Sequence, residues 1–168
     1  MRIESFLKQS PVFQINLSAR RLDGLLTRIL RQEEVTFFEA LVLAAIFFEK
    51  KRGVKPSELA ATFQTTRGNV SQCLSSLEAK GLVRRRIDPD DARALQMTLQ
   101  PAGKKRAARV VGILHRMQGQ FEQIVGTKGL EAMLARMFAV ESLCSGLAQN
   151  TDQRPESDLH EESQTIPG

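Results

Sequence analysis

The chain of 168 residues is long enough for one compact domain, or for a small domain with an attached assembly element. Hydrophobic residues make up 42% of it, enough for a packed core, and the net charge is +5. The charge is uneven, because residues 151–168 contain five acidic side chains and a single arginine. The basic remainder favours an anionic partner, nucleic acid before a membrane surface, although solvated lysines could supply much of the charge.

Targeting and membrane-spanning segments are not expected. Residues 1–10 lack a basic start followed by an apolar run, so we expect no signal peptide. The longest unbroken apolar run, Ala40 to Phe48, is far shorter than a membrane span. The two cysteines, Cys73 and Cys144, cannot make a disulfide scaffold, and a reducing cytoplasm is the expected compartment.

The N-terminal part predicts two helices. Ser10-Pro11 is typical of a helix start, and apolar residues then recur at spacings of three and four up to Ile29. This stripe predicts a seam against another helix, in a partner or equally well in the same chain. Thr36 and Glu39 form a capping-box pattern before a nearly all-apolar helix, which should be central and buried. Gly53 is the expected C-cap of that helix, after three basic residues that suit its dipole.

A helix-turn-helix pattern follows. Pro56 opens a short helix, Gln64-Thr65 is a brief joint, and Thr66 can cap a second helix that ends near Lys80-Gly81. The second helix carries a buried stripe of Val70, Leu74 and Leu77, with polar residues off the stripe.

Two short strands are predicted next, Leu82 to Ile87 and Ala94 to Leu99, around the turn-forming Asp88-Pro89-Asp90-Asp91. In the second strand Leu95, Met97 and Leu99 should share one face. This hairpin with a long tip is the wing of a winged helix.

Two further helices complete the predicted fold, which is mostly α with a small β-hairpin wing (α+β). One begins at Pro101 and the other follows Gly126-Thr127, and both carry apolar seams. Seams at both ends of the chain are most simply explained by a helical bundle shared between two subunits. We therefore expect helical dimerisation regions at 10–32 and 104–148, a winged helix-turn-helix at 33–103, and a disordered acidic tail at 149–168.

The order of elements and the residues together resemble the MarR family of bacterial transcription regulators, over roughly Ser10 to Leu147. The most specific segments are Leu77 to Arg85 and Asp88 to Arg93, which contain the Asp-x-Arg wing signature. The resemblance implies a homodimer whose recognition helices enter successive major grooves of DNA, while Arg93 enters the minor groove and Asp91 holds it. Two departures are Ala92, where the family is often basic, and Gln100, where a helix-capping threonine is usual.

The residues on the polar face of the second helix suit DNA. Gln72 and Asn69 match the major-groove edge of adenine, and Arg67 matches guanine or a phosphate. Ser71 and Thr66 can serve phosphates or bases, and Gly68 would let the helix start approach the DNA backbone. The alternative is that these are ordinary solvated residues.

Further basic residues flank this helix. Because successive strand residues face opposite ways, Arg84 and Arg86 share a face that excludes Arg85. We expect at least one of the three to brace the wing through Asp88, Asp90 or Asp91 and at least one to face phosphate. The basic residues early in the next helix are better explained by a solvated face than by phosphate contact (Lys104, Lys105, Arg106 and Arg109).

The cysteines and histidines give weaker predictions of function than the DNA-binding pattern does. Cys73 is expected to be a small buried hydrophobe, with a redox switch as the alternative, and Cys144 to belong to a packing seam. His115 and His160 have no partner ligands at metal spacing, so we predict neither a metal site nor a cofactor.

The expected function is a dimeric, sequence-specific regulator that binds double-stranded DNA, most simply a repressor. The resemblance implies release by a small aromatic effector in a cleft that Phe13, Phe37, Phe38 and His115 could line, although burial in the core is the better explanation for each phenylalanine. The alternative is a winged helix used for protein–protein assembly. The sequence contains no nucleophile–base pair or phosphate loop, so we do not expect an enzyme.

Overall fold

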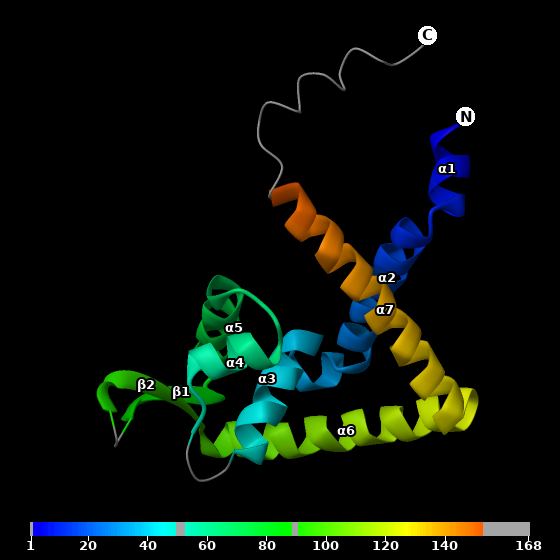
Figure 1. The fold of residues 1–168 in the computed structure, drawn as a ribbon. Coiled ribbons are helices and arrows are strands. Elements are labelled where there is room, and N and C mark those ends of the chain that lie inside the picture. Colours follow the sequence, from blue (N-terminus) through cyan, green and yellow to red (C-terminus); the bar gives the residue numbers. More distant parts are fainter. Residues whose placement is uncertain (1, 50–52, 89–90, 153–168) are drawn as a thin grey trace. The chain divides into compact units, whose positions relative to one another are not determined.

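The computed structural model describes residues 2–49, 53–88 and 91–152, and it confirms a mostly helical chain with one hairpin (Figure 1). The chain divides into two compact units, residues 1–116 and 117–168. In chain order the elements are α1 (Ile3–Gln9), α2 (Pro11–Ile29), the 3-10 helix η1 (Arg31–Glu33), α3 (Phe37–Phe48), α4 (Pro56–Thr62), α5 (Arg67–Ala79), β1 (Val83–Asp88), β2 (Asp91–Leu99), α6 (Pro101–Val125) and α7 (Thr127–Asp152).

Side-chain caps start three of the helices where the sequence predicts them. The Phe13 amide donates to Ser10 Oγ at 3.3 Å ahead of α2, and the Asn69 amide donates to Thr66 Oγ1 at 3.1 Å ahead of α5. At α3 the capping box is complete, because Glu39 N–H donates to Thr36 Oγ1 while Thr36 N–H donates to Glu39 Oε2. Each cap satisfies an amide that the first helical turn leaves without a partner.

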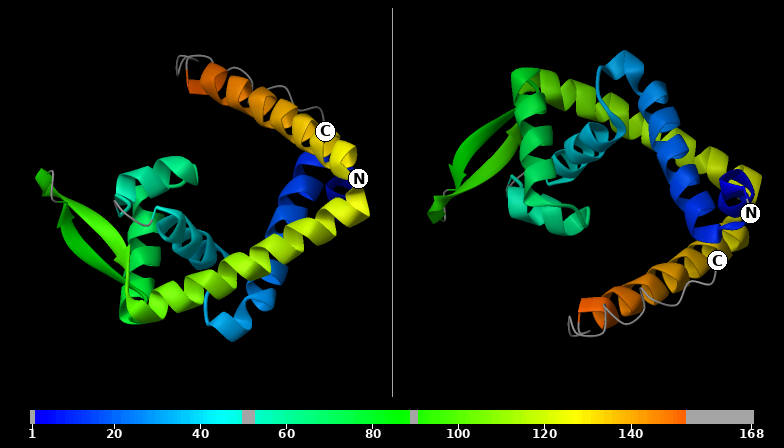
Figure 2. Two further views of the ribbon diagram at one scale, coloured as in Figure 1. Left: turned by 90° about the horizontal axis from the view of Figure 1, so that it is seen from below. Right: turned by 90° about the horizontal axis from the view of Figure 1, so that it is seen from above.

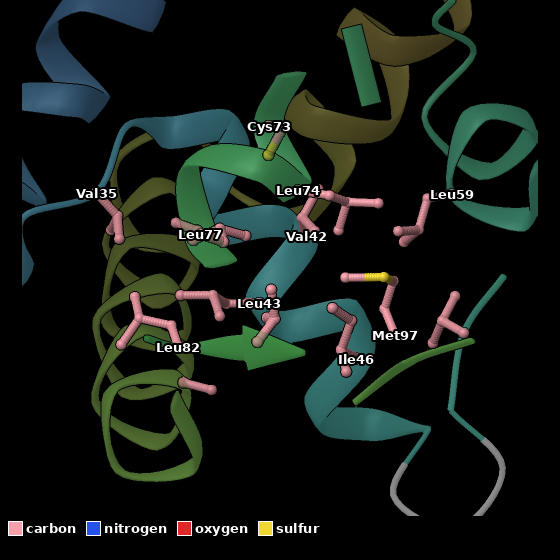
Figure 3. Packing of buried hydrophobic residues seen from close by; sticks show 14 of the residues in the cluster. Val35, Val42, Leu43, Ile46, Leu59, Cys73, Leu74, Leu77, Leu82 and Met97 are labelled. Atoms are coloured by element: carbon pink, nitrogen blue, oxygen red, sulfur yellow. The ribbon is translucent and has the colours of Figure 1, made fainter. Parts of the chain in front are cut away.

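Helix α3 is the centre of the core in the first unit. Its Val42, Leu43 and Ile46 are buried and belong to one cluster with Leu74 and Leu77 of α5. Figure 3 shows these side chains, with others from α4 and β2, gathered around α3. The buried stripe expected on α5 is therefore confirmed, and it fixes which face of α5 remains outside.

The second strand of the wing is longer, and the tip between the two strands is shorter, than the sequence predicts. β1 pairs antiparallel with β2, from Val83 opposite Leu99 to Ile87 opposite Leu95, and after an irregularity Asp88 lies opposite Asp91. Pro89 and Asp90 lie outside the described residues. The hairpin projects away from α4 and α5 in each view (Figures 1 and 2).

A third segment, which the sequence does not signal, pairs with the outer edge of β2. Val54 and Met97 exchange two backbone hydrogen bonds of 3.1 and 2.8 Å. Gly53 has a φ of +73°, and a Cβ there would lie 2.9 Å from Gln96 Oε1. Gly53 thus allows close approach to the sheet, whereas the C-cap of α3 is Glu49. This contact also explains why Gln96 is buried although the alternation of β2 predicts an outward residue.

The apolar seams of the terminal helices remain largely exposed. α6 buries Ala107 and Val110, but Phe121 and Ile124, farther along, are exposed. In the second unit α7 exposes several large apolar side chains, namely Met133, Leu134, Phe138, Leu143 and Leu147. The disordered tail expected from residue 149 is wrong in its start, because α7 continues to Asp152; residues 153–168 lie outside the described residues.

The start of α6 packs tightly on the turn that leads into β1. The Gln100 amide donates to the Leu82 carbonyl at 2.9 Å, and the Gln100 side chain donates to the Val83 carbonyl at 3.2 Å. One turn later Gly103 is buried, and a Cβ there would lie 1.8 Å from the Leu82 carbonyl oxygen. Only glycine therefore fits this contact between the wing and α6.

Replacing that glycine should be costly. We predict that Gly103→Ala lowers the free energy of unfolding by about 1–3 kcal/mol, because the backbone of residue 82 must move away from α6. Urea unfolding at one protein concentration measures the effect. Gly24→Ala is the control, since no atom lies within 4 Å of that Cβ and alanine should raise helix stability slightly. Equal midpoints for wild type and Gly103→Ala would contradict the contact.

Candidate nucleic-acid interface

The outer face of α5 is an exposed row of polar side chains. The structure exposes every candidate residue on this helix and at its cap: Thr66, Arg67, Gly68, Asn69, Ser71 and Gln72. Between them Val70 points into the core and is fully buried. The sequence therefore predicts this face correctly, and its side chains are accessible to a partner.

Two details refine the start of this row. The Asn69 carboxamide donates to Thr65 Oγ1 at 2.9 Å, so one of its hydrogen-bonding groups is already engaged. At Gly68 the nearest atom to an added Cβ would be Thr66 Oγ1 at 3.8 Å, an ordinary contact. Nothing within the chain requires glycine at this position.

The three arginines of β1 divide between two faces, as the alternation predicts. Arg84 and Arg86 are exposed and pair across the hairpin with Thr98 and Gln96. Arg85, on the other face, donates to Ser75 Oγ of α5 at 3.2 Å, and its Nε lies 3.4 Å from Glu78 Oε2.

The sequence analysis does not predict this contact between the wing and α5. The sequence signal that could have indicated it is the spacing of Ser75 and Glu78, which places both side chains on one face of α5, one turn apart. The wing brace expected through Asp88, Asp90 or Asp91 involves side chains outside the described residues. The same holds for the side chains of Asp91 and Arg93, whose backbones belong to β2.

The four basic residues early in α6 differ in their contacts, because two are exposed lysines and the other two are arginines that pair with acids. Lys104 and Lys105 are exposed, as expected. Arg109 instead makes a two-pronged contact with Glu33 of η1, with Nε 2.9 and 3.0 Å from the two carboxylate oxygens. Arg106 donates to Glu34 Oε2 at 3.1 Å. Arg109 is exposed, as expected, but it also pairs with an acid 76 residues away. Arg106 is half-buried and pairs with an acid 72 residues away, so both arginines are engaged within the chain.

The ion pair between Arg109 and Glu33 shifts the pKa of both residues. The hydrogen bond from Arg109 is the main cause that lowers the pKa of Glu33, and burial opposes it. The same bond raises the pKa of Arg109. Both groups are therefore charged at neutral pH, and η1 is held against α6.

Glu39 connects the start of α3 to the end of α5. Its side chain is 6% exposed, and both carboxylate oxygens lie 2.8 Å from Lys80 Nζ. Ser76 Oγ donates to Glu39 Oε1 at 2.6 Å, in addition to the capping bond from Thr36. Lys80 Nζ also donates to the Glu34 carbonyl at 2.9 Å. The C-terminal end of α5 is thus fixed to α3 and to the segment after η1.

The pKa of Glu39 reflects these contacts. Desolvation, the largest single influence, raises the pKa, but hydrogen bonds from Lys80, Ser76 and Thr36 together outweigh it and leave the pKa below its ordinary value of 4.5. Because the folded-state pKa is depressed, Glu39 contributes stability that is present above pH 4.5 and is lost as the pH falls through the folded-state pKa.

Cys73 is buried beside this cluster, which confirms that it is a small apolar residue of the core. Burial, with a smaller contribution from the charge of Glu39, raises the pKa of the Cys73 thiol to about 12. Cys144 on α7 is exposed.

A cavity of about 240 Å³ lies between the end of α2, the segment after η1 and the end of α5. It is lined by Thr27, Arg28, Arg31, Glu34, Val35, Thr36 and Lys80. The residues expected around an effector cleft do not line it. Phe37 and Phe38 pack against the core, Phe38 with its ring edge-on to Phe63 at 5.7 Å, while Phe13 is half-buried and His115 exposed.

The described residues hold neither a metal cluster nor a membrane-spanning helix. Within residues 2–49, 53–88 and 91–152, no group of three or more His, Cys, Asp or Glu side chains could hold a metal ion. No helix in the same part of the chain is long and apolar enough to cross a membrane.

Removing the charge at the centre of the cluster should loosen α5. We predict that Glu39→Gln lowers the free energy of unfolding at pH 7 by about 1.5–3 kcal/mol, because charge-assisted hydrogen bonds are lost. The difference from wild type should shrink below pH 4.5, since the wild-type carboxylate then becomes protonated. Urea unfolding at several pH values measures both effects, with the exposed Glu131→Gln as control. A difference independent of pH would show that the carboxylate charge is not responsible.

The Cys73 thiol should be inert in the native protein. In Cys144→Ser, alkylation by iodoacetamide at pH 8 should be at least about a thousandfold slower than in denaturant, because a pKa of about 12 instead of 9.0 suppresses the thiolate. Intact mass measured over time tests this. Rapid native labelling would instead support a redox switch at Cys73.

The comparisons with known proteins agree with this arrangement. The model of the MarR family matches residues 35–94, which contain α3, the two helices α4 and α5, and most of the wing. The chain is 28% identical over 122 residues to the HTH-type transcriptional regulator SarZ of Staphylococcus saprophyticus, an alignment that covers 73% of this chain and 82% of SarZ.

Two solved structures show the same fold. The S. aureus MepR–DNA complex has a TM-score of 0.71 at 21% identity and covers 80% of this chain and 98% of MepR. CouR from Rhodococcus jostii RHA1, bound to p-coumaroyl-CoA, has a TM-score of 0.65 at 17% identity and covers 80% of this chain and 93% of CouR. The family match over residues 35–94 and the fold shared with these structures identify this part of the chain as a winged helix-turn-helix of the MarR type.

Proposed function

We propose that the chain is a homodimeric transcription regulator that binds double-stranded DNA with α5 in the major groove and the wing in the adjacent minor groove. The observation that carries this proposal is the exposed polar row of α5, whose opposite side is fixed in the core. The proposed contact residues are Thr66, Arg67, Gly68, Asn69, Ser71, Gln72, Arg84, Arg86, Asp91 and Arg93.

The chemistry of the row suits base edges. Gln72 and the remaining groups of Asn69 offer a donor and an acceptor for adenine, and Arg67 offers two donors for guanine or a phosphate. The exposed first turn of α5 adds amides and the positive end of the helix dipole, both of which favour a phosphate.

The wing supplies the second group of contacts. Arg84 and Arg86 are exposed on one face of β1 and can neutralise phosphates. In this proposal Arg93 enters the minor groove and Asp91 orients it, as the Asp-x-Arg signature implies.

A second copy would give the two-fold symmetry that such DNA sites require. Exposed apolar seams on α2, α6 and α7 support this assembly, because a monomer would leave them in water. We propose 10–32 and 104–148 as the dimerisation regions and 33–103 as the DNA-binding domain. The two α5 helices would then meet half-sites about one helical turn apart.

A ligand-responsive repressor is the regulatory role we favour. CouR was solved with p-coumaroyl-CoA, an aromatic acyl ligand, which supports a small aromatic effector for a protein of the same fold. Repression and release by that ligand are the simplest way in which such an effector would act.

Selection from a random pool of DNA duplexes tests the proposal. We expect two-fold symmetric sites whose half-sites lie about one helical turn apart, and an affinity that falls steeply with salt because phosphate contacts release counterions. Arg93→Ala should weaken binding by about 1–3 kcal/mol, while Lys8→Ala on the exposed α1, outside every proposed contact region, should have no effect. Failure to enrich any sequence would favour the alternative of a protein–protein module, and a chain that stays monomeric at micromolar concentration would rule out the shared bundle.

A further inference from the structure

An apolar pair lies exposed on the wing beyond the core. Ile87 of β1 is 66% exposed and Leu95 of β2 is 47% exposed, and the register places them directly opposite each other. Large apolar side chains on a two-stranded hairpin have little to pack on except each other. The pair is therefore available for contact with another molecule.

The face of the hairpin on which the pair lies follows from the strand alternation. Ile87 and Leu95 share a face with Arg85 and Met97, because side chains two residues apart point the same way. Met97 is buried in the core, and Arg85 reaches Ser75 and Glu78 on the polar side of α5. The apolar pair therefore continues the face of the wing that is turned toward α5.

DNA geometry fixes what that face would meet. Neighbouring major and minor grooves share one sugar–phosphate strand, so a protein with α5 in one groove and the wing in the next must hold that strand between them. The phosphates of the strand suit Arg85, which lies on the same face as the apolar pair. Its deoxyribose rings present C–H surface, which suits the side chains of Ile87 and Leu95.

We propose that Ile87 and Leu95 pack against the deoxyribose rings of the DNA strand that passes between α5 and the wing. This inference rests on the proposed function and adds an apolar contact to it. The pair removes water from the sugars beside the groove that the wing enters. It thereby strengthens binding without reading a base and without adding to the salt dependence.

A matched pair of substitutions isolates this contact. The double variants Ile87→Val/Leu95→Val and Ile87→Thr/Leu95→Thr carry β-branched side chains of nearly equal shape, which suit a strand similarly. Urea unfolding of both variants checks that the hairpin is equally stable. They differ in replacing two methyl groups by hydroxyls. Binding is measured by fluorescence anisotropy on the two-fold symmetric duplex recovered from the random pool, at several salt concentrations.

We expect the Thr/Thr variant to bind about 5- to 50-fold more weakly than Val/Val, with an unchanged slope of log affinity against log salt. Arg86→Gln is the contrasting control, because loss of a phosphate contact should reduce that slope. Hydroxyl-radical cleavage, which reports the accessibility of the sugars, should lose protection in Thr/Thr only along the strand between the two grooves.

Other outcomes overturn the inference. Equal affinities of the two variants would show that the pair does not touch DNA. A reduced salt slope in Thr/Thr would assign its effect to phosphates, and a change in self-association alone would assign the pair to a second copy. If the wild-type protein binds no duplex at all, the proposed function itself fails, and this result is distinct from each of the others.

Discussion

The buried carboxylate of Glu39 is the contact on which the position of α5 depends. It caps α3 through Thr36 and accepts from Ser76 and Lys80 at the far end of α5. A carboxylate so little exposed is stable only when its oxygens are fully bonded, so α3 and α5 must keep this relative position. Lys80 extends the constraint to the Glu34 carbonyl, and the Arg109–Glu33 pair fixes the adjoining η1 to α6.

The inner side and the C-terminal end of α5 are therefore held, while its outer face and its first turn remain exposed. The wing is attached to the same frame twice: Leu82 packs against Gly103 at its base, and Arg85 reaches Ser75 and Glu78. Two surfaces with different chemistry are thus kept at a fixed spacing. Hydrogen-bonding side chains lie on α5, and arginines and an apolar pair lie on the hairpin, which is the arrangement that the proposed binding to two adjacent grooves uses.

Local chemistry was predictable from the sequence, and contacts distant in sequence were not. The caps at Ser10, Thr36 and Thr66 and the buried stripe of α5 follow from spacing alone. Gln96 is buried because the segment of Gly53 and Val54, far earlier in the sequence, pairs with β2. The close approach at Gly53 depends on the same pairing. Likewise the pairing of Arg109 with Glu33 spans 76 residues, and no periodicity indicates it. The exposure of the polar face of α5 was predictable because it follows from the buried stripe, whereas the contact of Arg85 with α5 required the register of the hairpin.

In the binding mode that we propose, α5 occupies a major groove while the wing occupies the neighbouring minor groove. Methylation interference with dimethyl sulfate separates the two, because the reagent modifies guanine N7 in the major groove and adenine N3 in the minor groove. We predict that N7 methylation blocks binding within each half-site and that N3 methylation blocks it at the flanking positions, with the second effect lost in Arg93→Ala. Binding unaffected by N7 methylation anywhere in the site would contradict the account.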